Sequence, residues 1–338
     1  MRCRLVGSEM CIRDRSKQAK KSIRRYRNAA FLLSAVYQSA HKAKKWRLNL
    51  FRSIIDLQGV INPKVKNTKK EEIFLDGIRT LKVTTPKSDP ERILLYFHGG
   101  GFSFCSPESH YSLVSYLADI TEMTVFVPDY RLGPENMFPS QLEDGLNSYL
   151  FLLNDMKYSS SQIAIAGDSA GGNLALTTLL KLKEKNYELP ACLALLSPWA
   201  DPTSSGSSYT IEMANRDILL GPTFKKIWSN NDNAYDFFID EKDMDKTNPY
   251  IVPLNGDYKN CPPILIQVGT EELLLSDSQT LKDVLERDEC IHEYYEWEGM
   301  YHVFHLDARM PETIKAFEQI GNFIEKYIKK QKLSVHEQ

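Results

Sequence analysis

Short runs of apolar and aromatic residues recur along the chain from about residue 71 onward. Most of the intervals between them have apolar positions at helical spacing, as in 174–185 and 276–287. Such runs are typical of strands buried on both faces, so their alternation with helices predicts a mostly parallel sheet covered on both faces. The expected strands are ILLYF (93–97), TVFVP (124–128), QIAIA (162–166), CLALL (192–196), ILIQV (264–268) and EYYEW (293–297).

Two stretches depart from this alternation. EEIFLDGIRTLKV (71–83) offers two short strands around Asp76-Gly77, a dipeptide that favours a tight hairpin turn. Residues 197–263 place about 65 residues between consecutive strands, which is too long for a plain loop. We therefore expect a small lid region here.

The segment 16–70 has its own pattern. Its apolar residues recur at steps of three and four, which predicts an amphipathic helical segment in two pieces. We expect Gly59 and Pro63 to close it. The apolar positions are Ile23, Tyr26, Ala30, Leu33, Tyr37, Ala40, Leu48, Phe51 and Ile55.

This segment is also strongly basic. It holds 15 lysines and arginines and one acid, Asp56, although the chain of 338 residues has a net charge of −2. We interpret it as a pair of helices that pack on the main body with their lysines in water. Adsorption to a membrane surface and organelle targeting stay open as alternatives. No apolar run approaches the roughly 20 residues needed to span a bilayer.

The first residues resemble no structural element. LVGSEMCIRDR (5–15) matches the translation of a common sequencing-library adapter, so we interpret residues 1–15 as an artefact and exclude them from the fold. The natural N-terminus, with any targeting signal, can then lie outside this sequence. Residues 331–338 are expected to form a C-terminal tail.

Composition limits the function classes. With 42% hydrophobic and 25% charged residues, the chain suits one large α/β domain or two small ones, and its near-neutral charge predicts no nucleic-acid partner. Outside the first 15 residues the cysteines are scattered, which favours a reducing, cytoplasmic compartment over a disulfide scaffold. These cysteines are Cys105, Cys192, Cys261 and Cys290.

A candidate nucleophile follows the strand at 162–166. GDSAGG (167–172) places Ser169 between that strand and a helix-forming run, which is the setting that a G-x-S-x-G nucleophile turn requires. A sharp turn there presents the serine oxygen at the carboxyl edge of the sheet. The alternative is an ordinary Gly-Ser turn at a helix N-terminus.

A glycine-rich loop follows the strand at 93–97. In HGGGF (98–102), successive glycines let backbone N–H groups face an oxyanion with no side chain in the way. A phosphate-binding loop is the competing interpretation, but the spaced glycines and the lysine of such loops are missing.

A candidate base comes late in the chain. GMYHVF (299–304) puts His302 in a loop after the last strand, behind the serine and then an acidic stretch. That order matches the Ser, Asp or Glu, His order of α/β-hydrolase triads. His305 is the alternative base.

These motifs together resemble a known family. HGGGF, DYRLGPE (129–135), GDSAGG, LLSPWAD (195–201) and GMYHVF occur in the order found in the hormone-sensitive-lipase-type branch of the α/β hydrolases. The resemblance covers about residues 70–330. It implies an α/β-hydrolase fold, with a mostly parallel eight-stranded sheet flanked by helices in a core at 71–330. The same resemblance implies a helical cap, built from the basic N-terminal helices of residues 16–70 and an insertion at about residues 200–250. It also implies a lipase-like serine carboxylesterase, with short to medium acyl chains as the expected substrates.

Of the three triad residues, the acid is the one that the sequence pattern specifies least. VGTEELLLSDS (268–278) holds three carboxylates after the strand at 264–268. In the family the acid is more often Asp, and its slot falls here on Glu272. We expect Asp277 to lie in the following helix and Glu271 to point to the other side of the strand end; both stay open as alternatives.

The expected mechanism is acyl transfer to water by Ser169, His302 and Glu272. Backbone N–H groups of Gly100, Gly101 and Ala170 would hold the oxyanion, and no metal or other cofactor is needed. The expected partner is a small-molecule ester, and a homodimer is a further expectation. An amidase or N-deacylase with the same triad, or a non-catalytic small-molecule receptor on this fold, are the alternatives.

Substrate-binding residues cannot be assigned by pattern. The aromatic stretch of Tyr235, Phe237 and Phe238 fits the core of the cap and a pocket wall equally well. Cys105, just past the glycines, is expected near the site as a structural residue, since no His or Lys adjoins it in sequence.

Overall fold

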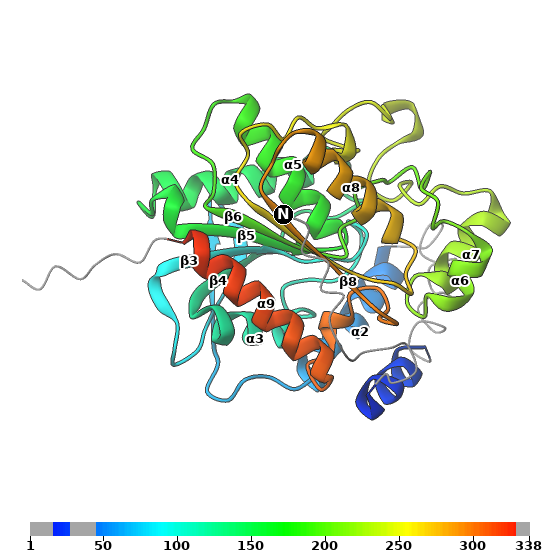
Figure 1. Ribbon diagram of the computed structural model, residues 1–338, viewed down its shortest axis with the longest axis horizontal. Coiled ribbons are helices and arrows are strands. Elements are labelled where there is room, and N and C mark those ends of the chain that lie inside the picture. The colour runs from blue at the N-terminus through cyan, green and yellow to red at the C-terminus, as the bar shows by residue number, and fades with distance from the viewer. Residues whose placement is uncertain (1–15, 28–44, 329–338) are drawn as a thin grey trace, which may run out of the picture.

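The computed structural model describes residues 16–27 and 45–328 of the chain. Its centre is a single eight-stranded sheet with the order β1-β2-β4-β3-β5-β6-β7-β8 (Figure 1). All strands from β4 to β8 in that order pair in parallel, whereas β1 and β2 form an antiparallel hairpin and β2 pairs antiparallel with β4. The predicted mostly parallel α/β sheet is therefore confirmed.

Each expected strand is present within one or a few residues of its predicted bounds. Strands β4, β5, β6 and β7 are buried along their whole length, as their unbroken apolar runs require, and β3 is buried from Arg92 onward. The hairpin turns at Asp76-Gly77. The strands are β1 (Lys69–Leu75), β2 (Ile78–Thr84), β3 (Asp89–Phe97), β4 (Met123–Pro128), β5 (Ile163–Asp168), β6 (Cys192–Leu196), β7 (Ile264–Gly269) and β8 (His292–Trp297).

Helices cover both faces of the sheet. One face packs against α3 (Tyr111–Thr121) and α9 (Pro311–Tyr327), and the other against α4 (Ser140–Asn154), α5 (Ala170–Glu184) and α8 (Leu275–Arg287). Alternate residues of each strand enter the two cores; in β3, Leu94 joins the first and Leu95 the second. Helices thus cover both faces of the sheet, so we expect the functional site at one of its edges.

The N-terminal segment contributes two described helices, residues 17–27 and α2 (Lys45–Ile61). Tyr26 of the first packs on Tyr301, with ring centroids 5.6 Å apart, and Phe51 of α2 packs edge-on against Phe104. The predicted apolar positions Ala30, Leu33, Tyr37 and Ala40 lie outside the described residues. Both described helices pack beside loops that follow strands, so this segment reaches the carboxyl edge of the sheet.

One expectation for this segment is wrong. Gly59 does not end the second helix, because α2 continues through it to Ile61. A Cβ built on Gly59 would come 1.6 Å from the carbonyl oxygen of Glu108. The glycine therefore allows close packing of α2 on the body, and the chain leaves the helix only just before Pro63.

The long insertion between β6 and β7 contains two helices and two short 3₁₀ turns. The helices, α6 (Ile211–Arg216) and α7 (Gly221–Asn230), stand together at the right of Figure 1, beyond the ends of the strands. The turns are η3 (Glu241–Asp243) and η4 (Pro253–Asn255); two others, η2 (Ser160–Gln162) and η5 (Phe304–Leu306), lie elsewhere. No helix within residues 16–27 and 45–328 is long and apolar enough to cross a membrane.

Candidate active site

The predicted site residues converge at the carboxyl edge of the sheet. Ser169 follows β5, Glu272 follows β7, His302 follows β8, and the glycine loop follows β3. Because these strands are parallel, the segments leaving them emerge at the same edge. Residues far apart in sequence are thereby brought into one cluster.

Ser169 sits on a sharp strand-to-helix turn between β5 and α5. Its backbone has φ of 54° and ψ of −119°, which a non-glycine residue rarely adopts. Gly171 permits this turn, since a Cβ there would come 2.0 Å from the carbonyl oxygen of Phe97. The backbone N–H of Ser169 donates to the carbonyl of Leu196 at 3.0 Å, which ties the turn to the end of β6.

His302 joins the serine to the acid. Its Nε2 lies 3.0 Å from Oγ of Ser169, and its Nδ1 lies 3.0 Å from Oε2 of Glu272. A carboxylate only accepts, so Nδ1 carries the proton and Nε2 is left to accept from the serine hydroxyl. The other oxygen of Glu272 accepts the N–H of Gly269 at 3.1 Å. All three side chains are buried or nearly so.

The carboxylates around His302 set its protonation. Burial acts to lower the pKa of His302, but the hydrogen bond and the charge of Glu272, with Asp217 and Asp168 farther away, outweigh it and raise the pKa above 6.5. Burial has the opposite effect on the acid: it raises the pKa of Glu272, and the hydrogen bond and charge of the imidazole only partly oppose this rise. A proton on this histidine is thus better stabilised than in water.

The glycine loop turns back on itself beside the serine. Gly100 and Gly101 both have positive φ, at 116° and 60°, and a Cβ on Gly100 would come 2.3 Å from the carbonyl oxygen of Phe104. Among the described residues, no acceptor takes a hydrogen bond from the N–H of Gly100, Gly101 or Ala170. Gly100 and Gly101 line the same cavity as Ser169.

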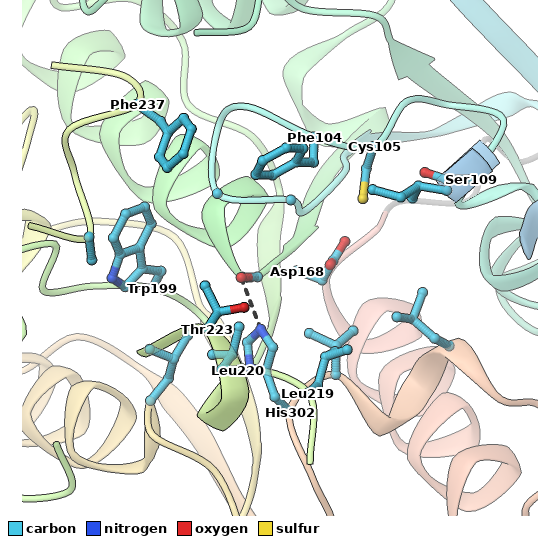
Figure 2. A pocket seen from close by; sticks show the side chains of 18 of the residues that line it. Phe104, Cys105, Ser109, Asp168, Trp199, Leu219, Leu220, Thr223, Phe237 and His302 are labelled. Atoms are coloured by element: carbon cyan, nitrogen blue, oxygen red, sulfur yellow. Dashed lines mark hydrogen bonds between the residues drawn. The ribbon is translucent and has the colours of Figure 1, made fainter. Parts of the chain in front are cut away.

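This cavity has a volume of about 220 Å³. Figure 2 shows His302 on one side, with the dashed bond to Ser169, and the rings of Phe104 and Phe237 on the opposite side. Most of the lining is apolar and comes from three parts of the chain, namely α2, the glycine loop and the insertion. The apolar side chains from α2 and the insertion include Phe51, Ile55, Leu219, Leu220, Phe224, Ile227 and Phe237.

Comparison with known proteins identifies the family. A sequence profile of the alpha/beta hydrolase fold matches residues 94–306. The chain belongs to the α/β hydrolases. It is 35% identical over 254 residues to an acetyl-hydrolase of Streptomyces hygroscopicus, covering 75% of this chain and 82% of that one. It is 30% identical over 276 residues to an esterase of Acinetobacter venetianus, covering 81% and 88%.

Solved structures agree with this assignment. An esterase from the bacterial hormone-sensitive lipase family superposes on this hydrolase with a TM-score of 0.82 and 28% identity, covering 94% of this chain and all of that one. A hormone-sensitive lipase from a metagenome library gives 0.77 and 32% identity, covering 90% and 98%. The predicted resemblance to this branch of the α/β hydrolases, with its eight-stranded fold, is confirmed.

The two alternative acids of the hydrolase lie elsewhere. Glu271 forms a bidentate pair with Arg216 of α6, with distances of 2.6 and 2.5 Å. Asp277, in the first turn of α8, accepts the backbone N–H of Asp201 at 2.8 Å and the hydroxyl of Tyr209 at 3.2 Å. Only Glu272 of the three contacts the imidazole.

The alternative base is also separate from the serine. His305 is fully buried, and its Nε2 lies 3.0 Å from Oε1 of Gln267. Burial lowers the pKa of His305 to about 3, so it stays neutral at ordinary pH. It is part of the core beneath His302.

Asp168 is a site residue that the sequence analysis did not single out. Its Oδ1 accepts the hydroxyl of Tyr96 at 2.7 Å and the N–H of Gly99 at 2.9 Å, and His110 Nε2 lies 3.2 Å away. Burial acts to raise the pKa of Asp168, but the charge and hydrogen bond of His110, with the bond from Tyr96, hold it below its usual value. This carboxylate therefore ties the glycine loop to the serine turn. Its position beside Ser169 is a signal, but its partners cannot be read from sequence.

The aromatic residues of the insertion do not all have the same role. Phe237 lines the cavity, whereas Tyr235 and Phe238 pack in the main core. Cys105 also lines the cavity, and burial raises the pKa of its thiol to about 12, which keeps it protonated.

Proposed function

We propose that the protein is a serine esterase that hydrolyses carboxylic esters through an acyl-enzyme. The observation that carries this proposal is the pair of 3.0 Å contacts that link Ser169 through His302 to Glu272 at the wall of an apolar cavity. The relatives named acetyl-hydrolase and esterase support the same chemistry. A receptor that only binds its ligand would have no need for this arrangement.

The geometry supports a stepwise mechanism. Ser169 attacks the ester carbonyl while Nε2 of His302 takes its proton, and Glu272 holds the imidazolium that forms. The developing oxyanion accepts hydrogen bonds from the N–H groups of Gly100, Gly101 and Ala170; such a donor contributes about 3 kcal/mol to the transition state. His302 then returns the proton to the departing alcohol, and water repeats the cycle on the acyl-enzyme.

The cavity supports short to medium acyl chains as substrates. Its volume of about 220 Å³ and its apolar lining suit a hydrocarbon chain of limited length. Each methylene buried there contributes about 0.8 kcal/mol until the cavity is full. Rate should therefore rise with acyl length and then fall.

Two further expectations concern the surroundings of the enzyme. The thiols of Cys105, Cys192, Cys261 and Cys290 are free, which supports a reducing, cytoplasmic location. The described N-terminal helices support contact with an anionic membrane surface, because residues 17–27 expose lysines and arginines and α2 exposes an apolar stripe. The stripe is Leu50, Ile54, Leu57 and Ile61. Co-sedimentation with anionic and with neutral vesicles tests that contact, and light scattering tests the expected homodimer.

The decisive test uses purified protein, a fluorophosphonate probe and nitrophenyl esters of increasing acyl length. We expect labelling and turnover in the wild type and neither in Ser169→Ala. Ser53→Ala, at an exposed serine of α2, is the matched control and should behave as the wild type. A matched ester and anilide pair distinguishes an esterase from an amidase. Unlabelled wild-type protein with no turnover of any ester would refute the proposal.

A further inference from the structure

Asp217 is a buried carboxylate whose contacts join two parts of the site. It lies in the insertion between α6 and α7 and is 1% exposed. Its Oδ2 accepts the backbone N–H of Leu273, the residue after Glu272, at 2.9 Å. Its Oδ1 accepts the N–H groups of Leu219 at 3.0 Å and Leu220 at 2.9 Å. One side chain thus holds backbone from the cap and from the segment that carries the acid.

The residues that Asp217 binds belong to the cavity wall and to the segment that carries the acid. Leu219 and Leu220 line the substrate cavity. Leu273 is also held on its other side, because Ser208 of the insertion donates its hydroxyl to the carbonyl of Leu273 at 2.5 Å. Both polar backbone groups of the residue that follows Glu272 are therefore bound by the insertion. The position of the acid depends on where the cap sits.

The negative charge of Asp217 also acts on His302. All three of its hydrogen-bond partners are N–H donors, so the ionised, acceptor-only form suits them. Burial raises the pKa of Asp217, while the nearby His302 and these N–H groups oppose the rise. The carboxylates that act on His302 are Glu272 after β7, Asp217 from the insertion and Asp168, the last residue of β5. On the same loop as His302, His305 is close enough for the charge of His302 to affect its pKa.

We propose that Asp217 is a positioning residue of the esterase, which fixes Glu272 against His302 and ties that geometry to the cavity wall at Leu219 and Leu220. The inference rests on the proposed function. The insertion would then do more than cover the cavity, since a movement of the insertion would displace the segment that carries the acid, with Asp217 as the link that also holds the cavity wall. The alternative is that Asp217 only caps the turn before α7 and contributes to stability.

The test compares Asp217→Asn and Asp217→Ser in the full chain. Asparagine keeps the shape but loses the charge. Serine keeps an oxygen that can cap Leu219 and Leu220 but is too short to hold Leu273 as well. We expect kcat to fall by about 10²-fold in both, because a small displacement of the acid misaligns the imidazole, with a smaller change in KM. The acid limb of kcat/KM should also shift to lower pH, since a negative charge near His302 is gone.

Glu271→Gln is the matched control. Glu271 precedes Glu272 and also binds the insertion, through Arg216, but that arginine side chain is 54% exposed, and neither residue is among the largest influences on the pKa of His302. Its loss should leave kcat and the acid limb unchanged. Thermal unfolding reports whether each variant is folded.

Each outcome decides the inference. A folded Asp217 variant with the kcat and acid limb of the wild type would overturn it, as would an equal shift in Glu271→Gln. Failure of both Asp217 variants to fold would assign the residue to stability alone and overturn it too. A wild type without ester turnover would instead refute the proposed function, so the two failures are distinguishable.

Discussion

Oε2 of Glu272 lies 3.0 Å from Nδ1 of His302, although a second carboxylate, Asp277, lies in the first turn of the helix that follows. The glutamate leaves the end of β7 and folds back so that its other oxygen accepts the N–H of Gly269. Asp277 is turned toward the segment after β6 and binds the backbone of Asp201. The end of β7, rather than the number of acids nearby, determines which one reaches the imidazole.

The first prediction concerns the acid itself. Glu272→Gln should lower kcat on a short-chain nitrophenyl ester by about 10⁴-fold, because an amide favours the wrong tautomer of His302 and cannot stabilise the imidazolium. Steady-state kinetics measure the effect, and Glu271→Gln serves as the control at the adjacent position. If Glu272→Gln kept kcat within tenfold of the wild type, this assignment of the acid would be wrong.

The second prediction concerns pH. His302 must be neutral to take the serine proton, and the carboxylate of Glu272 raises its pKa above 6.5. Activity should therefore be lost as pH falls, with the midpoint of the kcat/KM profile above 6.5. In Glu272→Gln the residual activity should persist to lower pH, because the charge that raised the pKa is absent. A wild-type midpoint well below 6.5 would contradict this electrostatic account.

The third prediction concerns Asp277 and stability. Burial and the nearby Asp201 raise the pKa of Asp277 well above 3.8, and its Oδ1 has no hydrogen-bond partner within the described structure. A raised pKa in the fold means that this group stabilises the protein below about pH 3.8 and that the contribution is lost as pH rises. Asparagine cannot ionise, so Asp277→Asn should be more stable than the wild type at neutral pH.

Thermal unfolding across pH measures this difference. The gap in Tm between Asp277→Asn and the wild type should widen from pH 4 upward and vanish in acid. Esterase activity of the variant should stay near that of the wild type, since Asp277 does not contact His302. A variant less stable than the wild type at pH 7 would show that the carboxylate is ionised and well satisfied.

Much of this architecture could be predicted from the sequence because buried parallel strands have unbroken apolar runs. The strand ends could then be aligned, which placed Ser169, His302 and Glu272 at one edge of the sheet. The same reasoning failed at Gly59, where the glycine serves a close approach to Glu108 rather than a helix end. A contact between distant segments leaves no mark in the local pattern.

The polar contacts beneath the site show the same limit. Asp168 and Asp217 are each one carboxylate among many along the chain, and their importance comes from partners far away in sequence. Pattern reasoning finds residues whose neighbours in sequence define their chemistry, as at GDSAGG. It cannot find a side chain that binds backbone groups from two other segments.

The last prediction concerns Arg52, which connects α2 to the glycine loop. From α2, its guanidinium donates to the carbonyl of Ser103 at 2.9 Å, to the carbonyl of Gly133 at 2.7 Å, and to both oxygens of Glu135. Ser103 follows the glycines proposed to hold the oxyanion. Removal of the guanidinium should therefore loosen both the packing of α2 and that loop.

We expect Arg52→Ala to lose about 2 kcal/mol of unfolding free energy, since hydrogen bonds to charged groups contribute on that order. It should also lose about tenfold in kcat, as the oxyanion donors are held less firmly. Arg52→Lys should recover little, because one ammonium group cannot reach three separate acceptors as the planar fork does. Lys87→Ala, which removes an exposed pair with Asp119, is the control and should change neither quantity measurably. Denaturant unfolding and ester kinetics on the same preparations test both effects. A destabilised Arg52→Ala that keeps the kcat of the wild type would show that the contacts of Arg52 do not contribute to catalysis.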